Sequence, residues 1–285
     1  MKFVDCTVRL HPSSSTLALF GLGDFHADDR GFHKRLLREY VEEIRADLNA
    51  YVFLLGDYFN ALRAKIRKQL RPEPEAMADL DSPMLYRTTQ FYRSYLAPLQ
   101  GRILGAIDGN HRWEFASGET DTQVLCRLTG AQYLGNLAGV RIRVLGLKGG
   151  DHSMALTGII HHGHWGGGAS TPGGDLNSVV NKGKPWDVDF VFAGHTHQRN
   201  IHISETLTIP TRGRMFPKAV QKATIRTGSF LRQYVPDTST NAVERYTETK
   251  LLSPSELGTD PLYVRFRREK IGGSTFVVHE LRKRR

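Results

Sequence analysis

The sequence of 285 residues has only two cysteines, Cys6 and Cys126. Two cysteines are too few for a disulfide framework, and neither has a second cysteine nearby at the spacing of a zinc finger. We therefore expect two buried free thiols, and any metal site must take its ligands from other side chains.

Long hydrophobic runs are also missing. No stretch approaches the ~18 consecutive apolar residues that a membrane span requires. The amino terminus lacks the charged segment, apolar core and small-residue cleavage site of a secretory signal. These features predict a soluble, cytoplasmic protein with no membrane partner.

A glycine-rich stretch from Trp165 to Gly174 lacks the lysine and the Ser/Thr of a phosphate-binding P-loop. We interpret it as a mobile rim over a binding site, because such loops commonly border functional sites. A nucleotide-phosphate cradle is the less favoured interpretation.

Acidic side chains are fewer than basic ones, at 29 Asp and Glu against 39 Lys and Arg, which gives a formal charge of +10. This balance favours anionic partners such as nucleotides, nucleic acid or membrane surfaces, without choosing among them. A basic helix predicted over residues 61–71 could grip a phosphate backbone. Its charges could equally form a solvated face, which is the commoner case.

Five apolar runs, expected to be strands, each end in residues that can bind a metal. The runs are followed by Asp24 and His26, by Asp57, by Asn110 and His111, by the histidine cluster 161–164, and by His195 and His197. In open α/β sheets, ligands bind at the carboxyl ends of the strands, so these side chains describe one shared site.

The spread of these strands bears on the domain organisation. The candidate ligands run from Asp24 to His197 with no low-complexity linker between them, so a domain boundary would have to cut the site. We predict one domain over residues 1–285, with a β-hairpin at about 262–281 near its carboxyl end.

Other elements follow from periodicity. Helices are expected over 31–49, 83–96, 121–130 and 175–183, and an opening strand over 2–10. Beyond His197, segments 201–203, 206–209 and 223–226 are expected to be strands of a second sheet.

The order of the motifs resembles that of the calcineurin-like metallophosphoesterase family. The resemblance covers roughly residues 15 to 230 and rests on Asp24-Phe25-His26, Gly56 to Asn60, Gly109-Asn110-His111, His161 to His164, and Gly194 to His197. The segment 226–229 is also similar to the Gly-Ser strand end that often follows the last motif. This resemblance implies an α/β fold, a four-layer αββα sandwich of two mixed sheets flanked by helices, with two metal ions at the strand ends.

The resemblance also implies an assignment of ligands. One metal would take Asp24, His26 and His197, the other would take Asn110, His162 and His195, and Asp57 would bridge them. For the fourth motif His162 is favoured, with His161 as the alternative and His164 nearby. Imidazole and carboxylate ligands without thiolate suit Mn, the expected ion, with Fe, Zn, Co or Ni as alternatives.

Two residues are assigned to catalysis. His111 corresponds to the family histidine that can donate a proton to the leaving oxygen. Most family members follow this histidine with Asp or Glu, whereas here it is followed by Arg112, whose guanidinium could bind phosphate oxygens as charge develops.

The leading functional hypothesis is a phosphodiesterase acting on nucleic acid or a nucleotide diester by attack of a metal-bridging hydroxide. Asp57 is followed by Tyr58-Phe59-Asn60, which lacks the continuation typical of protein Ser/Thr phosphatases. The alternatives are a small-molecule phosphomonoesterase, a cyclic-nucleotide phosphodiesterase and, from another class, a non-catalytic metal-binding scaffold. The sequence does not indicate the oligomeric state.

Overall fold

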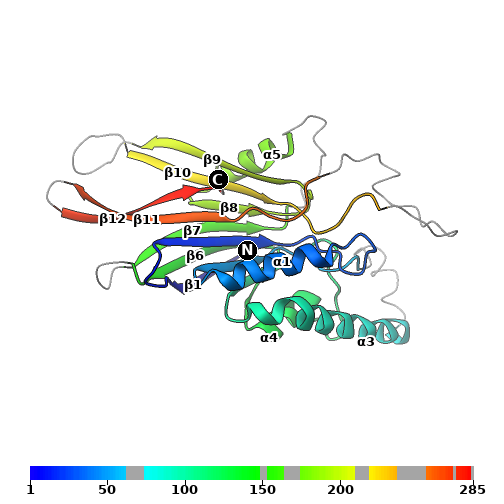
Figure 1. Ribbon diagram of the computed structural model, residues 1–285. Helices are drawn as coiled ribbons and strands as arrows, with labels where there is room; N and C mark the ends of the chain where they lie inside the picture. The colour runs from blue at the N-terminus through cyan, green and yellow to red at the C-terminus, as the bar shows by residue number, and fades with distance from the viewer. Residues whose placement is uncertain are drawn as a thin grey trace.

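The computed structural model describes residues 1–61, 74–147, 153–163, 174–208, 218–235, 255–271 and 274–283. Two six-stranded sheets pack face to face, and helices lie on both outer sides (Figure 1). Each sheet mixes parallel and antiparallel pairs. The predicted four-layer αββα sandwich is confirmed.

The sheet that begins with the first strand, here the β1 sheet, has the strand order β1-β6-β7-β8-β10-β9. Its parallel pairs are β1 with β6, β7 with β8, and β8 with β10, and the other pairs are antiparallel. The strands are β1 Lys2–Arg9, β6 Leu137–Leu145, β7 Met154–His161, β8 Phe190–Ala193, β9 Arg199–Thr208 and β10 Lys218–Thr227.

The other sheet, here the β2 sheet, has the order β12-β11-β2-β3-β4-β5. Strands β2 to β5 run parallel, and β11 pairs antiparallel with both β2 and β12. The strands are β2 Thr16–Leu22, β3 Ala50–Leu54, β4 Ile103–Ile107, β5 Gln132–Gly135, β11 Leu262–Ile271 and β12 Ser274–Arg282.

The main core lies between the two sheets and follows the two-residue period of the strands. In β6, Val140, Ile142 and Val144 are buried between the sheets, whereas Arg141 and Arg143 point outward and are exposed. Burying each such aliphatic side chain contributes about 1.5–3 kcal/mol. This packing fixes the position of the two sheets relative to each other. It therefore also fixes the edge of the sandwich at which their parallel strands end.

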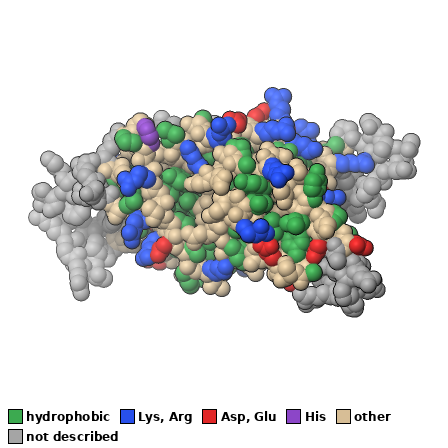
Figure 2. Space-filling view, turned by 90° about the horizontal axis from the view of Figure 1, so that it is seen from below, with side chains coloured by type: hydrophobic (Ala, Val, Ile, Leu, Met, Phe, Trp, Pro, Cys, Tyr) green, Lys and Arg blue, Asp and Glu red, His purple; other side chains and the backbone are tan. Residues whose placement is uncertain are grey.

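Helices α1 Lys34–Ala46, α3 Pro74–Phe91 and α4 Asp121–Thr129 cover the β2 sheet, and α5 Gly174–Gly183 lies on the β1 sheet (Figure 1). A π-helical turn, Tyr92–Leu96, and a 3-10 turn, Ala97–Leu99, continue α3. None of the described helices is long and apolar enough to cross a membrane. On the face shown in Figure 2, Lys and Arg side chains are spread among hydrophobic and other uncharged side chains and some Asp and Glu.

Some expected elements differ from those observed. The expectation of a second sheet beyond His197 was wrong, because β9 is continuous and pairs with β10, which in turn pairs with β8. Ile201 and Ile203 face the main core from this extension of the β1 sheet. Strands β5 and β6 were not anticipated, and Pro83 lies inside α3 instead of starting a helix. Residues 62–71, the glycine-rich stretch up to residue 173, and His164 lie outside the described residues.

Candidate metal centre

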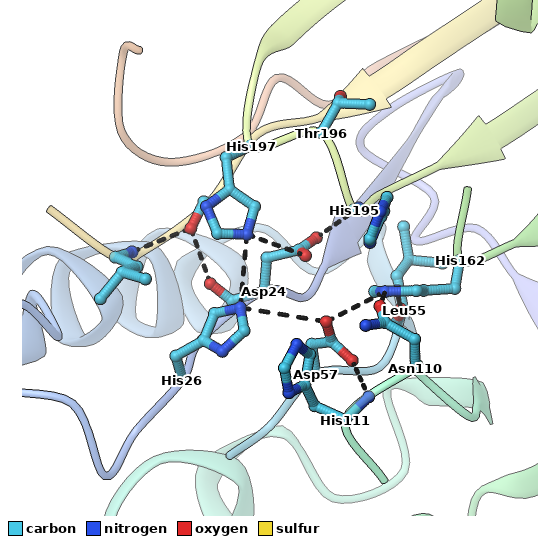
Figure 3. Close-up of polar contacts among 12 residues, drawn as sticks. Asp24, His26, Leu55, Asp57, Asn110, His111, His162, His195, Thr196 and His197 are labelled. Carbon is cyan, nitrogen blue, oxygen red and sulfur yellow. Dashed lines mark hydrogen bonds and ion pairs between the residues drawn. The ribbon is translucent and has the colours of Figure 1, made fainter. Parts of the chain in front are cut away.

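The polar strand ends identified from the sequence meet at one edge of the sandwich, between the two sheets. Strands β2, β3 and β4 approach this edge from one sheet, and β7 and β8 approach it from the other. The side chains brought together are Asp24, His26, Asp57, Asn110, His111, His162, His195 and His197 (Figure 3).

The first cluster consists of Asp24, His26 and His197, which each offer one ligand atom within 4.8 Å of the others. The Nε2 atoms of His26 and His197 are 3.3 Å apart, and His197 Nε2 is 3.4 Å from Asp24 Oδ1. Two atoms that bind one ion at about 2.0–2.2 Å lie roughly 3–3.5 Å from each other. The spacing therefore fits a shared divalent cation.

Asp24 supports this interpretation by its burial. Its side chain is fully buried, and its Oδ1 makes no hydrogen bond to any residue in the described part of the chain. A buried carboxylate oxygen without a donor is costly unless a cation satisfies it. The oxygen that faces the two imidazoles is thus available to a metal.

The second cluster consists of Asp57, His162 and His195. His162 Nε2 lies 2.8 Å from Asn110 Oδ1 and 3.1 Å from Asp57 Oδ2. Asn110 therefore joins this cluster as a fourth oxygen or nitrogen donor. These two clusters contain the same residues that the family resemblance assigns to the two metals.

The hydrogen bond on the far side of His162 determines what its Nε2 can do. Its Nδ1 is 2.6 Å from the carbonyl oxygen of Leu55, which only accepts, so Nδ1 carries the proton. With Nδ1 protonated, Nε2 faces the oxygens of Asp57 and Asn110, and it carries a second proton there in the metal-free protein or binds a cation once that proton leaves. Burial lowers the pKa of His162, but the carboxylate of Asp57 more than compensates and raises it to about 9 in the metal-free protein.

His26 is oriented in a similar way. Its Nδ1 is 2.6 Å from Oδ1 of Asn60, and the amide nitrogen of Asn60 donates to Asp29, which fixes the amide orientation. Nδ1 of His26 is therefore the protonated nitrogen, and Nε2 is directed at the cluster. Burial lowers the pKa of His26, so the ring is neutral and able to bind a metal.

Asp57 lies between the clusters. Its Oδ2 is 3.1 Å from His162 Nε2 of one cluster and 3.9 Å from His26 Nε2 of the other. Burial works to raise the pKa of Asp57, but the neighbouring His162 lowers it below the ordinary value, so the group is a carboxylate. A Cβ at Gly109 would overlap Oδ1 of Asp57, so only glycine there permits this position.

The backbone of the site is strained. Among the residues that the structure describes, the non-glycine residues with positive φ are Asp24, His26, Asp57, His195 and His197, with values from 45° to 68°. Such conformations cost of order 1–3 kcal/mol each and persist where the surroundings enforce them. They are confined here to five of the seven predicted ligands, which indicates that the turns are shaped to aim these side chains.

The two predicted catalytic residues lie beside the clusters. The half-buried ring of His111 lies 5.5 Å from that of His26, edge to face, and its buried Nδ1 makes no hydrogen bond to a described residue. The guanidinium of Arg112 lies 3.8 Å from the Asp108 carboxylate and donates to Asn136 at 3.2 Å. Contact of Arg112 with a phosphate stays a prediction.

His161, the alternative ligand, is on the outer side of the β1 sheet. Its Nδ1 accepts a hydrogen bond from the amide of Gly163, and it lines a cavity of about 130 Å³ with Lys182 and Trp186. The structure therefore brings His162, and not His161, into the cluster.

Sequence reasoning missed residues that hold the ligands in place. Asn60 was part of a quoted motif but had no assigned role, and the carbonyl of Leu55 gives no signal in the sequence. Ser229, from the Gly-Ser strand end, donates its hydroxyl to the carbonyl oxygen of Asp24 at 2.7 Å. The motif resemblance could have identified Ser229, whereas the other contacts depend on three-dimensional proximity.

No protein-family model and no curated protein matches the sequence. Among solved structures, a double mutant of Vps29 from Entamoeba histolytica has a TM-score of 0.40 at 16% identity, covering 94% of this chain and 100% of that one. Wild-type Vps29 complexed with Zn²⁺ from the same organism has 0.34 at 12% identity, covering 93% and 99%.

A conserved protein from Streptococcus pneumoniae, described as a predicted phosphoesterase, has a TM-score of 0.33 at 13% identity, covering 93% of this chain and 98% of its own. With TM-scores below 0.5, these likenesses carry no argument about metal or activity.

Proposed function

We propose that the protein is a calcineurin-like metallophosphoesterase that uses two divalent metal ions to hydrolyse phosphodiesters. The observation that carries this proposal is the position of Asp57, whose carboxylate lies between two clusters of buried metal-binding side chains. One shared carboxylate between two nitrogen- and oxygen-rich clusters is the arrangement of a two-metal phosphoesterase.

Asp24, His26 and His197 would hold one ion, and Asn110, His162 and His195 the other, with Asp57 shared. When bound, a pair of divalent ions polarises phosphoryl oxygens and lowers the pKa of water near neutrality. Imidazole, carboxylate and amide donors without thiolate favour Mn, with Fe, Zn, Co and Ni as alternatives.

The chain's own residues supply the remaining chemistry. His111 has a buried, unbonded ring nitrogen next to the first cluster, which suits a group that donates a proton to the leaving oxygen. The partly exposed guanidinium of Arg112 supplies positive charge at the neighbouring position. The contact with Asp108 holds the guanidinium of Arg112 next to His111. From that position Arg112 would bind two phosphate oxygens.

The proposed substrates are phosphodiesters of nucleic acid or of a nucleotide. The formal charge of +10 supports this choice, because it attracts anionic substrates. Residues 62–71, which carry much of the basic segment, lie outside the described part of the chain, so this support rests on overall charge alone.

The test is a substrate panel assayed with added Mn²⁺, using a phosphomonoester, a linear diester, a cyclic nucleotide and single-stranded DNA. Preferential hydrolysis of the linear diester and DNA is expected. Faster hydrolysis of the monoester would instead identify a phosphomonoesterase, and faster hydrolysis of the cyclic nucleotide would identify a cyclic-nucleotide phosphodiesterase. Two bound ions without turnover on any substrate would identify a metal-binding scaffold instead.

A further inference from the structure

Arg226 is the largest fully buried side chain among the described residues, with 2% of its surface exposed. It belongs to β10, the strand that lies between β8 and β9, and is paired with Ala193 on one side and Asn200 on the other. The turn 194–198, which connects β8 to β9, must therefore pass over the end of β10. Arg226 lies directly beneath that turn.

The guanidinium of Arg226 holds the turn through two side chains. Its Nε and Nη2 donate to Oγ1 of Thr196 at 3.1 and 2.7 Å, and Nη2 also donates to Oε1 of Gln198 at 3.0 Å. The amide of Gly228 adds a bond to the carbonyl oxygen of Gln198 at 3.2 Å. Strand β10 therefore holds the turn at two positions, Thr196 and Gln198.

Thr196 and Gln198, the two positions held by β10, alternate along the chain with His195 and His197. Thr196 lies between His195 and His197 and points away from their rings (Figure 3). His197 belongs to the first cluster and His195 to the second. Both have positive φ, 57° and 68°, so this short turn carries strain while supplying one imidazole to each cluster.

We propose that Arg226 is a positioning residue that holds Thr196 and Gln198 and thereby fixes where His195 and His197 present their rings to the two clusters. This inference rests on the two-metal site of the proposed function. A planar guanidinium can donate from two nitrogens to one hydroxyl and still reach a second acceptor, whereas a lysine ammonium is a single point charge on a flexible stem. The geometry of the turn therefore requires arginine at this position.

Thr196→Val and Thr196→Ser form the matched pair that tests this role. Thr196 is partly exposed, so both variants should fold, and valine removes only the hydroxyl that Arg226 binds. Thr206→Val on the exposed part of β9 is the control for the same substitution elsewhere. Mn²⁺ alone is the probe, measured by calorimetric titration and by the electron paramagnetic resonance signal of an exchange-coupled ion pair.

We expect Thr196→Val to bind at least one of the two ions about tenfold more weakly and to lose the coupled signal, because residues that orient ligands affect metal affinity on this scale. Thr196→Ser and Thr206→Val should behave as wild type in metal binding and in metal-free melting temperature, whereas Thr196→Val should also melt a few degrees lower, because the buried guanidinium loses an acceptor. Arg226→Lys should reproduce the valine phenotype.

Wild-type affinity and coupling in Thr196→Val would overturn the positioning role while leaving the proposed function intact. A lower metal-free melting temperature in this variant, with unchanged coupling, would assign Arg226 to fold stability and would also overturn it. If wild-type protein binds no coupled pair, both the inference and the proposed function fail.

Discussion

The backbone amide of His111 donates a hydrogen bond of 2.9 Å to Oδ1 of Asp57. This bond joins the predicted proton donor to the carboxylate shared by the two clusters. Asp57 lies after β3 and His111 after β4, so the bond also ties two neighbouring strand ends together. A change in the position of either residue is therefore passed directly to the other.

Asp57→Asn should weaken both metal sites, because the substitution removes the charge that faces each cluster. We expect turnover of the preferred substrate to fall more than about a hundredfold, since even indirect supports of metal ligands cost 10–100-fold. Elemental analysis and kinetics would check this. Asp5→Asn, at an exposed ion pair on β1, is the control. Full activity of Asp57→Asn with normal metal content would contradict the site.

His111→Ala should distinguish leaving groups. An aryl leaving group such as p-nitrophenolate needs little protonation, whereas a ribose oxygen needs a proton, so the alkyl diester should lose about 10²–10⁴-fold and the aryl diester far less. The ratio of kcat/KM for the two diesters measures the effect. Equal losses on both substrates would remove His111 from the acid role.

Metal binding at the second cluster should release a proton from His162. Its pKa is raised to about 9 in the metal-free protein, so between pH 6.5 and 9 the ion must displace that proton, and apparent affinity should rise about tenfold per pH unit. Calorimetry in buffers of different ionisation enthalpy would count the proton. Affinity that is flat over this range would show that His162 is neutral before the metal binds.

The same shift predicts how the stability of the metal-free protein depends on pH. Because the folded pKa of His162 is raised above the ordinary value of 6.5, its contribution is complete below about pH 6.5 and is lost as the pH rises toward 9. Chelated wild type should therefore lose stability over that range. His162→Asn should show a flatter profile in denaturant titrations.

A second pH effect is expected far from the site, at Asp189. Burial would raise the pKa of this carboxyl, but the hydrogen bond from His279, at 3.2 Å, and those from Thr157 lower it overall. Its contribution is present above about pH 4 and is lost as the pH falls through the lowered folded pKa. Asp189→Asn should cost about 1–3 kcal/mol at pH 7, and this cost should shrink progressively as the pH falls below about 4.

Denaturant titrations at several pH values would measure that difference. Glu39→Gln, at the exposed ion pair with Arg35, should change stability by less than about 1 kcal/mol at any pH. A cost for Asp189→Asn that is independent of pH would show that the carboxylate charge does not contribute.

The fold was predictable from the order of the motifs through the family resemblance, and the meeting of the polar strand ends was predictable because their signals are local. An apolar strand that ends in Asp, Asn or His is visible in a few consecutive residues, and five such endings predict one shared site at the carboxyl ends of the strands. The helix over 121–130 was also predictable, since Thr120 and Gln123 form a capping box and Gly130 ends α4 at a φ of 76°.

The remaining features depend on contacts between distant segments. Nothing near Arg226 in the sequence indicates that it lies under the turn at Thr196. For the same reason, the sheet to which β9 and β10 belong was predicted wrongly. Strand β6 is different, because Val140, Ile142 and Val144 alternate with polar residues and the pattern was available. Local alternation identifies a strand, but only the partner strand determines its sheet.

The five ligand residues with positive φ have a consequence for how this chain can change. Glycine adopts such angles freely, so replacing any of these residues with glycine would relax the turn while removing a ligand. Without selection for metal binding, substitutions to glycine at these positions would therefore make the fold more stable. These five positions therefore give up some stability of the turns in exchange for the placement of candidate metal-binding side chains.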